Sequence, residues 1–223
     1  MTSSSLPFAS LRLYSYWRSS CAWRVRIGLG LKGMAYEYVP VNIAPSQNQQ
    51  YSLGYREKNA MQQVPLLECI GGAYDGKTLS QSVAILEFLD EILPSPALLP
   101  RDVWLRAQVR KAVEIVNSGT QPLQNLNVQK KIRDLGGDEK IWLKDIIHKG
   151  MVALEEAAAT SAGQFFVGDE VTFADVCLVP QMYSARRYEV ALDAFPKLVE
   201  IDARCMKLSA FANSVPERMP DAT

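Results

Sequence analysis

Histidine is nearly absent from this sequence, which has a single one, His148, among 223 residues. That scarcity leaves too little material for a histidine-rich metal site or a Ser-His-Asp triad. Cysteine is also sparse, and Cys21, Cys69, Cys177 and Cys205 stand far apart with no Cys-x-x-Cys pair. Such spacing argues against a zinc site or a disulfide framework and fits a reducing compartment. Any chemistry should therefore use hydroxyls, thiols, helix ends and arginines, or a borrowed cofactor.

Net charge and long apolar runs are also missing. Lys plus Arg number 24 and Asp plus Glu number 24, a balance that argues against a nucleic-acid-binding surface. No apolar run approaches the roughly 20 residues that a transmembrane helix needs. Residues 1–10 contain serines and no early basic residue, so a secretory signal is not expected. The sequence thus predicts a cytoplasmic protein without membrane or nucleic-acid partners, long enough for one large domain or two modest ones.

The first ninety residues alternate strand and helix signals. The expected elements are strands at 11–14 and 36–41 around a helix that ends at a left-handed Gly33, a strand after Val64-Pro65, a hairpin at 71–77, and a helix over 83–92 capped by Ser80 or Ser82. A βαβ unit of this length predicts that the first two strands are parallel. Gly28 and Gly30 should let the first helix pack close to the sheet. Val64-Pro65 is either the cis-proline of a thioredoxin-like fold or a trans edge-proline, the commoner isomer.

A proline-punctuated stretch at 94–100 marks the clearest domain boundary. It divides a thioredoxin-like α/β domain at 9–93 from an all-α helical domain at 101–223. The helices expected in the second domain cover 102–117, 138–158, 172–188, 195–207 and 209–215. Thr172 and Asp175 form an acidic variant of a capping box, which predicts a folding role for them.

The stretch from Tyr14 to Arg26 organises the whole chain, because Ser19, Ser20 and Cys21 fall where a strand ends and a helix begins. Helix starts carry unpaired N–H groups and positive potential, which bind anions and lower the pKa of a thiol. Two interpretations are open on these residues alone. In the first, one serine, expected to be Ser20, caps the helix and Cys21 is a small buried apolar residue. In the second, the three residues line an active site.

Several motifs together resemble the zeta-class glutathione transferases, the maleylacetoacetate isomerases. They are Ser-Ser-Cys-x-Trp-Arg-Val-Arg-Ile from Ser19, Gln63-Val64-Pro65, Gln81-Ser82, Gln-Pro-Leu-Gln-Asn-Leu from Gln121, Gly-Asp-Glu-Val-Thr-x-Ala-Asp from Gly168, and the terminal Met-Pro-Asp. The resemblance covers about residues 11–221. It implies a thioredoxin-like βαβαββα domain followed by a helical domain, and a homodimer.

The resemblance also implies a role for each site residue. Ser19 would activate the sulfur of glutathione, with Ser20 and Cys21 beside it. The remaining glutathione contacts would be Gln50 for the glycyl end, Val64 for the cysteinyl backbone, Gln81 and Ser82 for the γ-glutamyl end, and Gln121 and Asn125 from the helical domain. Arg187, with Arg24 as a second candidate, would bind the carboxylates of an acidic substrate, and Arg186 would add positive charge there or remain solvated.

The implied activity is the glutathione-dependent isomerisation of 4-maleylacetoacetate to 4-fumarylacetoacetate in tyrosine and phenylalanine breakdown. A thiolate can add to the cis double bond, permit rotation, and leave again. Two further interpretations remain open among enzymes: a general glutathione transferase or peroxidase acting on small electrophiles such as α-halo acids, and a redox relative that uses Cys21 as nucleophile. A non-catalytic binding protein on the same fold is the alternative from another class. Ala60, where the family usually has proline, and a long hairpin at 68–78 are departures from the family pattern.

Overall fold

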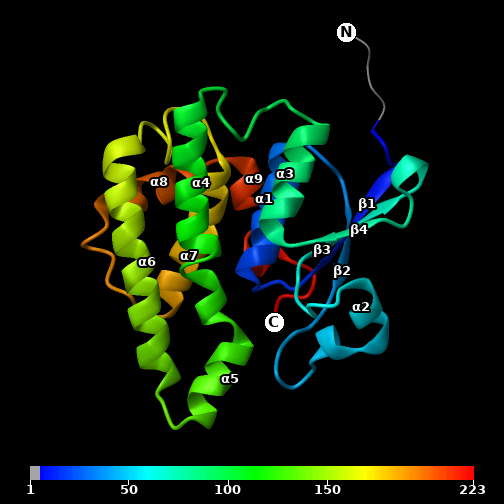
Figure 1. Cartoon of the computed structure of the whole chain (residues 1–223), viewed down its shortest axis with the longest axis horizontal. Helices are drawn as coiled ribbons and strands as arrows, with labels where there is room; N and C mark the ends of the chain where they lie inside the picture. Colours follow the sequence, from blue (N-terminus) through cyan, green and yellow to red (C-terminus); the bar gives the residue numbers. More distant parts are fainter. Residues whose placement is uncertain (1–5) are drawn as a thin grey trace. The chain divides into compact units, whose positions relative to one another are not determined.

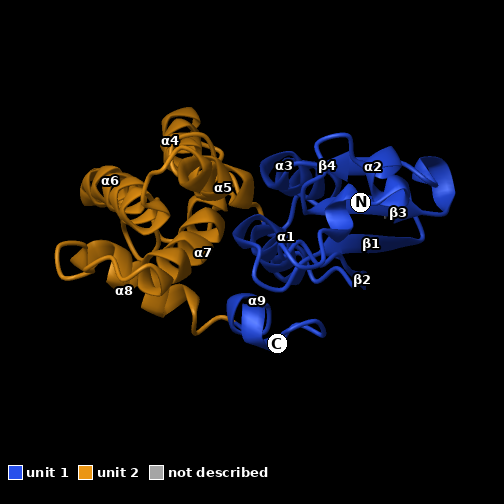
Figure 2. Cartoon of the chain, turned by 90° about the horizontal axis from the view of Figure 1, so that it is seen from below, with its two compact units in different colours: residues 1–96, 209–223 blue, residues 97–208 orange. Residues whose placement is uncertain are grey.

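The computed structural model describes residues 6–223 and divides into two units. Unit 1 comprises the chain up to Pro96 together with Ser209–Thr223, and unit 2 is Ala97–Leu208 (Figure 2). The expectation that there is no secretory signal rests on residues 1–10, of which residues 1–5 lie outside the described range. Within that range no helix is both long and apolar enough to cross a membrane.

Unit 1 is built on a four-stranded mixed sheet with the strand order β2-β1-β3-β4 (Figure 1). Its strands are β1 (Ser10–Ser15), β2 (Glu37–Pro40), β3 (Leu66–Ile70) and β4 (Thr78–Ser80). β1 and β2 are parallel, which confirms the prediction from the βαβ spacing, whereas β3 runs antiparallel to both β1 and β4. The sheet and its helices confirm the thioredoxin-like prediction for this part of the chain.

Side-chain alternation along β1 separates two apolar clusters. Leu11 and Leu13 pack on one face with Val25 and Leu29 of α1 (Ser20–Leu31) and with α3 (Ser82–Ile92). Tyr14 contacts a second cluster that includes Tyr55 of α2 (Leu53–Lys58). Because successive side chains of a strand point to opposite faces, one short strand organises both layers.

The glycines of α1 differ from the sequence-based expectation in what they face. A Cβ on Gly28 would lie 2.3 Å from Leu86 of α3, and one on Gly30 would lie 3.2 Å from Ala210 of α9 (Ser209–Ala212). These glycines therefore let α1 approach two other helices closely, and not the sheet. Gly33, with φ +63°, ends the helix as predicted.

Unit 2 is helical, as predicted, and its helices are α4 (Val103–Asn117), α5 (Leu126–Asp134), α6 (Glu139–Ser161), α7 (Phe173–Arg187) and α8 (Pro196–Cys205). No helix was predicted at α5, because Pro122 interrupts the helical pattern just before it. The capping box at the start of α7 is confirmed: Thr172 accepts from Ala174 N, and Asp175 accepts from Thr172 N at 2.8 Å. Burial raises the pKa of Asp175 to about 6.

The last fifteen residues differ from the division expected from the sequence, which assigned all of 101–223 to the helical domain. Ser209–Thr223 groups with unit 1. Trp23 Nε1 donates to Ser214 Oγ at 3.0 Å, and Arg26 Nε donates to the Ser214 carbonyl at 3.2 Å. These buried bonds, with Gly30 against Ala210, attach the end of the chain to α1.

Candidate active site

Ser19 is the residue that begins α1. Its backbone is extended (φ −70°, ψ 117°), its N–H donates to Tyr16 O at 3.0 Å, and its Oγ accepts from Ala22 N at 3.2 Å. Ser19 is therefore the N-cap and Ser20 the first helical residue. The expectation that Ser20 caps the helix is wrong, because the helix starts at Ser20 itself, one residue earlier than that role requires.

The two sequence-based interpretations of this stretch are compatible at Ser19. The cap uses a lone pair of the hydroxyl oxygen, so the O–H proton is still available to donate to an anion. Ser20 and Cys21 occupy the first two helical positions, where backbone N–H groups have no intrahelical acceptor. All three residues are half-buried, so Cys21 is not the buried apolar residue of the first interpretation.

Arg26 holds the turn that delivers Ser19 to the helix start. Its Nη1 donates to Ser15 Oγ at 3.1 Å and its Nη2 donates to Trp17 O at 3.0 Å. Burial lowers the pKa of Arg26 to about 10, yet the group remains charged at neutral pH. Sequence reasoning quoted this arginine only as part of the Ser-Ser-Cys motif. Its place one helical turn after Ala22, within that motif, was the available signal.

Val64 lies at the start of β3 in a clamped turn. The Val64–Pro65 bond is cis. Tyr55 Oη and Asn59 Nδ2 both donate to the Gln63 carbonyl, at 2.6 and 2.7 Å. Burial raises the pKa of Tyr55 to about 12, so the phenol remains a donor. The turn is thus fixed by α2 and the residue after it, even with Ala60 in the place where the family usually has proline.

Gln50 is buried, whereas its neighbours Gln47, Asn48 and Gln49 are exposed. Only 6% of its surface is accessible, and its Oε1 is a buried acceptor with no hydrogen-bond partner among the described residues. Its Nε2 donates to Asn48 Oδ1 at 3.4 Å. A buried, unsatisfied carbonyl oxygen costs free energy unless a ligand donates to it.

Gln81 and Ser82 begin α3, and here the capping expectation is also wrong. The N-cap is Gln81, with φ +74° and no side-chain cap bond, so neither Ser80 nor Ser82 caps the helix. Ser82 is buried in the first helical position, and Arg24 Nη1 donates to its Oγ at 3.2 Å. Arg24 is itself only 1% exposed. Its side chain therefore holds Ser82, whereas the sequence offered it as a second candidate for the carboxylates of the substrate.

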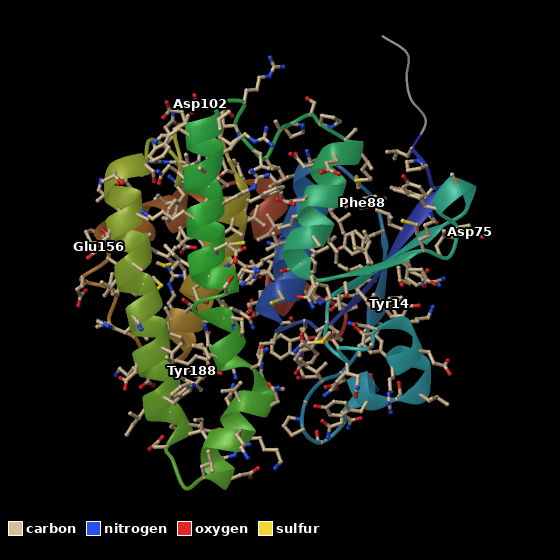
Figure 3. All side chains as sticks on the ribbon, in the orientation of Figure 1. Tyr14, Asp75, Phe88, Asp102, Glu156 and Tyr188 are labelled. Atoms are coloured by element: carbon tan, nitrogen blue, oxygen red, sulfur yellow. The ribbon has the colours of Figure 1, made fainter. Side chains whose placement is uncertain are left out.

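Strand register brings the unit 1 candidates to one edge of the sheet. Tyr14 pairs with Leu66, and Leu66 pairs with Ser80. β1 ends, β3 begins and β4 ends at that edge. The segments that carry Ser19, Val64 and Gln81 therefore all join the sheet there. β2 is parallel to β1 and ends beside it, with Ser15 opposite Pro40, and the loop after β2 carries Gln50. Tyr14, labelled in Figure 3, marks this end of β1.

In unit 2, a 3₁₀ turn over Gln121–Gln124 presents the expected amides. Gln121 Nε2 donates to Asn125 Oδ1 at 2.8 Å, so these two candidates lie together. Gln124, which sequence reasoning passed over, donates to Gln181 Oε1 at 3.1 Å and so ties the turn to α7. Its only signal was its place inside the quoted motif.

The two adjacent arginines at the end of α7 have different surroundings. Arg187 is exposed, with its guanidinium carbon 5.1 Å from the ring centroid of Tyr188, which Figure 3 labels at the end of α7. Arg186 pairs with Asp202 at 2.5 Å. Both arginines are exposed, but Arg186 is engaged in an ion pair with α8, whereas Arg187 contacts the ring of Tyr188.

Comparison with known proteins agrees with this geometry. Residues 9–91 match the family model described as the glutathione S-transferase N-terminal domain, and residues 130–213 match the C-terminal domain model. The fold and the two family models together define a glutathione transferase.

Individual relatives show which class of glutathione transferase this is. The probable maleylacetoacetate isomerase 2 of Drosophila melanogaster is 46% identical over 94% of this chain and 89% of its own. The crystal structure of maleylacetoacetate isomerase from Anaeromyxobacter dehalogenans 2CP-1, with bound GSH in its active site, is 48% identical with a TM-score of 0.87, covering 96% of this chain and 98% of its own. A maleyl pyruvate isomerase, described as a bacterial zeta-class glutathione S-transferase, is 36% identical with a TM-score of 0.89, covering 95% of this chain and 100% of its own. The chain belongs to the zeta-class glutathione transferases, the family that includes the maleylacetoacetate isomerases.

Proposed function

We propose that this chain is a glutathione-dependent isomerase that converts 4-maleylacetoacetate to 4-fumarylacetoacetate. The observation that carries the proposal is the convergence, at one sheet edge, of a capped serine, a cis-proline turn and a second helix start. Relatives of similar length, described as maleylacetoacetate isomerases, support the choice of 4-maleylacetoacetate as the substrate.

The residues at this edge suit a peptide-like anion such as glutathione. The buried Gln50 Oε1 can accept an N–H from its glycyl end. The backbone of Val64 can pair with its cysteinyl unit, as an added strand would. Gln81 and Ser82 stand at the start of α3, where N–H groups and the helix dipole suit the γ-glutamyl carboxylate. From unit 2, Gln121 and Asn125 complete the set that the family resemblance implies.

The protein's part in the reaction is orientation and charge stabilisation. When bound, glutathione supplies the thiolate that adds to the cis double bond and leaves after rotation. Ser19 donates its O–H toward the sulfur while Ala22 N–H holds its oxygen in place. The N–H groups of Ser20 and Cys21 add positive potential at the same helix start. These groups favour the thiolate over a thiol with an ordinary pKa near 8.5.

Arg187 supplies the charge for an acidic substrate. Its guanidinium is exposed at the end of α7, stacked against Tyr188, and not engaged with Asp202 as Arg186 is. An arginine fork binds a carboxylate in two places, which an apolar pocket cannot do. Arg24 supports the site indirectly, since its bond orients the Ser82 hydroxyl.

The second candidate is a general transferase acting on small electrophiles, and the maleyl pyruvate isomerase relative raises a related acid as substrate. The catalytic efficiency, kcat/KM, should be measured for maleylacetoacetate, maleylpyruvate and a neutral aryl halide. The proposal expects the cis-enedione acids to exceed the halide by orders of magnitude. Preference for the halide would instead establish the general transferase.

Assembly, location and pathway belong to the same proposal. The apolar side chains of Tyr51, Leu53 and Met61 in unit 1 are 56–72% exposed, and exposed apolar side chains of this size are typical of protein interfaces. They support a homodimer. The family resemblance implies that the protein acts in the cytoplasm, in tyrosine and phenylalanine breakdown. A sedimentation experiment that finds only a 24.8 kDa species would remove the dimer from the proposal.

A further inference from the structure

The terminal Met219-Pro220-Asp221 has no place in the chemistry described so far, although it is one of the motifs the chain shares with its family. In the structure its carboxylate lies against the turn that precedes Ser19. Asp221 Oδ2 accepts from the Trp17 backbone N–H at 3.0 Å, across 204 residues of sequence. Its Oδ1 accepts from Tyr38 Oη at 2.6 Å.

The same turn is held from its other side by Arg26, whose guanidinium donates to Ser15 Oγ and to the Tyr16 and Trp17 carbonyls. Asp221 thus takes the Trp17 N–H while Arg26 takes the Trp17 carbonyl. The backbone N–H and the backbone carbonyl of Trp17, two positions before Ser19, are therefore both held by charged side chains. Charged hydrogen bonds are the stronger kind.

Packing reinforces the contact. Met219 and Ala222 pack against the apolar cluster that contains Tyr16, Trp17 and Val64. The tail therefore packs on the apolar cluster to which the turn before Ser19 and the cis-proline turn both contribute. Upstream, Ser214 bonds to Trp23 and Arg26, so the tail is anchored at both ends.

We infer that Asp221 is a positioning residue for the glutathione site, and that the C-terminal tail acts as a clamp that holds the Tyr16–Arg18 turn in its binding conformation. The inference rests on the proposed glutathione site. It assigns a function to the end of the chain, which contributes no group that contacts the cofactor in that proposal.

Loss of the clamp should affect binding more than turnover. Without Asp221 the turn samples other conformations, and the apparent dissociation constant rises in inverse proportion to the fraction of molecules whose turn is competent to bind. Bound glutathione restores the order, so kcat at saturation stays close to that of the wild type. If about one molecule in ten keeps the turn in place, glutathione affinity falls roughly ten-fold.

The test uses the full-length chain with three substitutions. Asp221→Ala removes both bonds. Asp221→Asn can still accept from Trp17 N–H and donate to the Tyr38 oxygen, so it should restore most of the affinity. Arg218→Ala is the matched control, because Arg218 is exposed in the same tail and its side chain donates to Asn213, away from Trp17 and Tyr38.

Glutathione affinity should be measured by calorimetric titration, kcat by saturation kinetics, and protection of the Trp17 amide by hydrogen exchange without ligand. We expect Asp221→Ala to show about ten-fold weaker binding, faster exchange at Trp17 and near-normal kcat, with Asp221→Asn and Arg218→Ala close to wild type. Unchanged affinity or unchanged Trp17 exchange in Asp221→Ala, even with a lower melting temperature, would overturn the clamp. Wild-type protein that fails to bind glutathione would refute the proposed function instead, while the exchange result would still decide the clamp.

Discussion

Ser19 uses one hydroxyl for folding and for chemistry. Its oxygen accepts from Ala22 N at 3.2 Å and caps α1, and its proton is the group proposed to stabilise the thiolate. Ser20 and Cys21 share the helix start but not the cap. Substitutions along these three residues should therefore separate capping from sulfur activation.

Ser19→Ala should raise the pKa of the bound glutathione thiol and lower turnover at neutral pH. Each unit of pKa corresponds to about 1.4 kcal/mol, or ten-fold in the ratio of thiolate to thiol. Part of the loss should return as the pH is raised, and Ser19→Thr should retain activity because it keeps the hydroxyl. The measurement is a pH–rate profile at saturating glutathione.

The neighbouring variants serve as controls for that profile. Cys21→Ala and Ser20→Ala should keep much of the activity, since neither side chain caps α1 nor, in this scheme, attacks the substrate. An inactive Cys21→Ala beside a near-normal Ser19→Ala would establish the redox interpretation, with Cys21 as nucleophile, and exclude the present one.

Ser82 should matter for affinity. It lies remote from the reacting sulfur in the proposal, at the start of α3, with Arg24 donating to its Oγ. Ser82→Ala removes a hydrogen bond to a charged group, a loss of about 1.5–3 kcal/mol, so glutathione should bind roughly ten- to a hundred-fold more weakly. Turnover at saturation should change little. Equal affinity in a titration of wild type and variant would remove Ser82 from the site.

At the scale of elements, Asp175 links the start of α7 to pH-dependent stability. Burial raises its pKa from 3.8 to about 6, so the folded chain holds the proton more tightly than the unfolded chain. Its stabilising contribution is then complete below about pH 4 and is lost as the pH rises through about 6. Asp175→Asn cannot titrate.

The expected result is a change in the stability difference between the two proteins. From about pH 4 to pH 7, the wild type should lose up to about 3 kcal/mol of unfolding free energy relative to Asp175→Asn. Denaturant titrations at several pH values would measure it. Parallel stability curves for the two proteins would show that Asp175 has an ordinary pKa in the folded state.

The elements that were predicted correctly from the sequence are determined by residues that lie close together along the chain. The strand alternation at Leu11–Leu13, the left-handed stop at Gly33 and the Thr172–Asp175 capping box are each encoded within a few residues. The start of α1 was located to within one residue but its cap was assigned to the wrong serine. Both serines are equally good caps by type, and the choice depends on the Tyr16–Arg18 turn that Arg26 holds.

What could not be predicted depends on contacts distant in sequence. The attachment of Ser209–Thr223 to unit 1 rests on bonds such as Trp17 N–H to Asp221 and Trp23 to Ser214. The burial of Gln50 among exposed amides and the bond from Arg24 to Ser82 are of the same kind. No pattern of apolar spacing encodes such pairs, so only the family resemblance pointed to Gln50.

At the scale of the whole molecule, charge should determine which substrates turn over. Arg187→Ala should reduce kcat/KM for maleylacetoacetate by roughly ten- to a hundred-fold, since a charged hydrogen bond of about 1.5–3 kcal/mol is lost. Turnover of a neutral aryl halide should be nearly unchanged. Arg186→Ala is the matched control, because Arg186 pairs with Asp202. Equal losses for both substrates in Arg187→Ala would mean that Arg187 supports the fold.

The most direct test of the account is the isomerisation of maleylacetoacetate by the purified chain with glutathione, without it, and with S-methylglutathione. The thioether keeps the groups that the protein binds but has no proton to lose, so it cannot provide a thiolate. The account predicts turnover only with glutathione, and inhibition of that turnover by S-methylglutathione. Isomerisation at the same rate without glutathione, or no isomerisation at saturating glutathione, would contradict it.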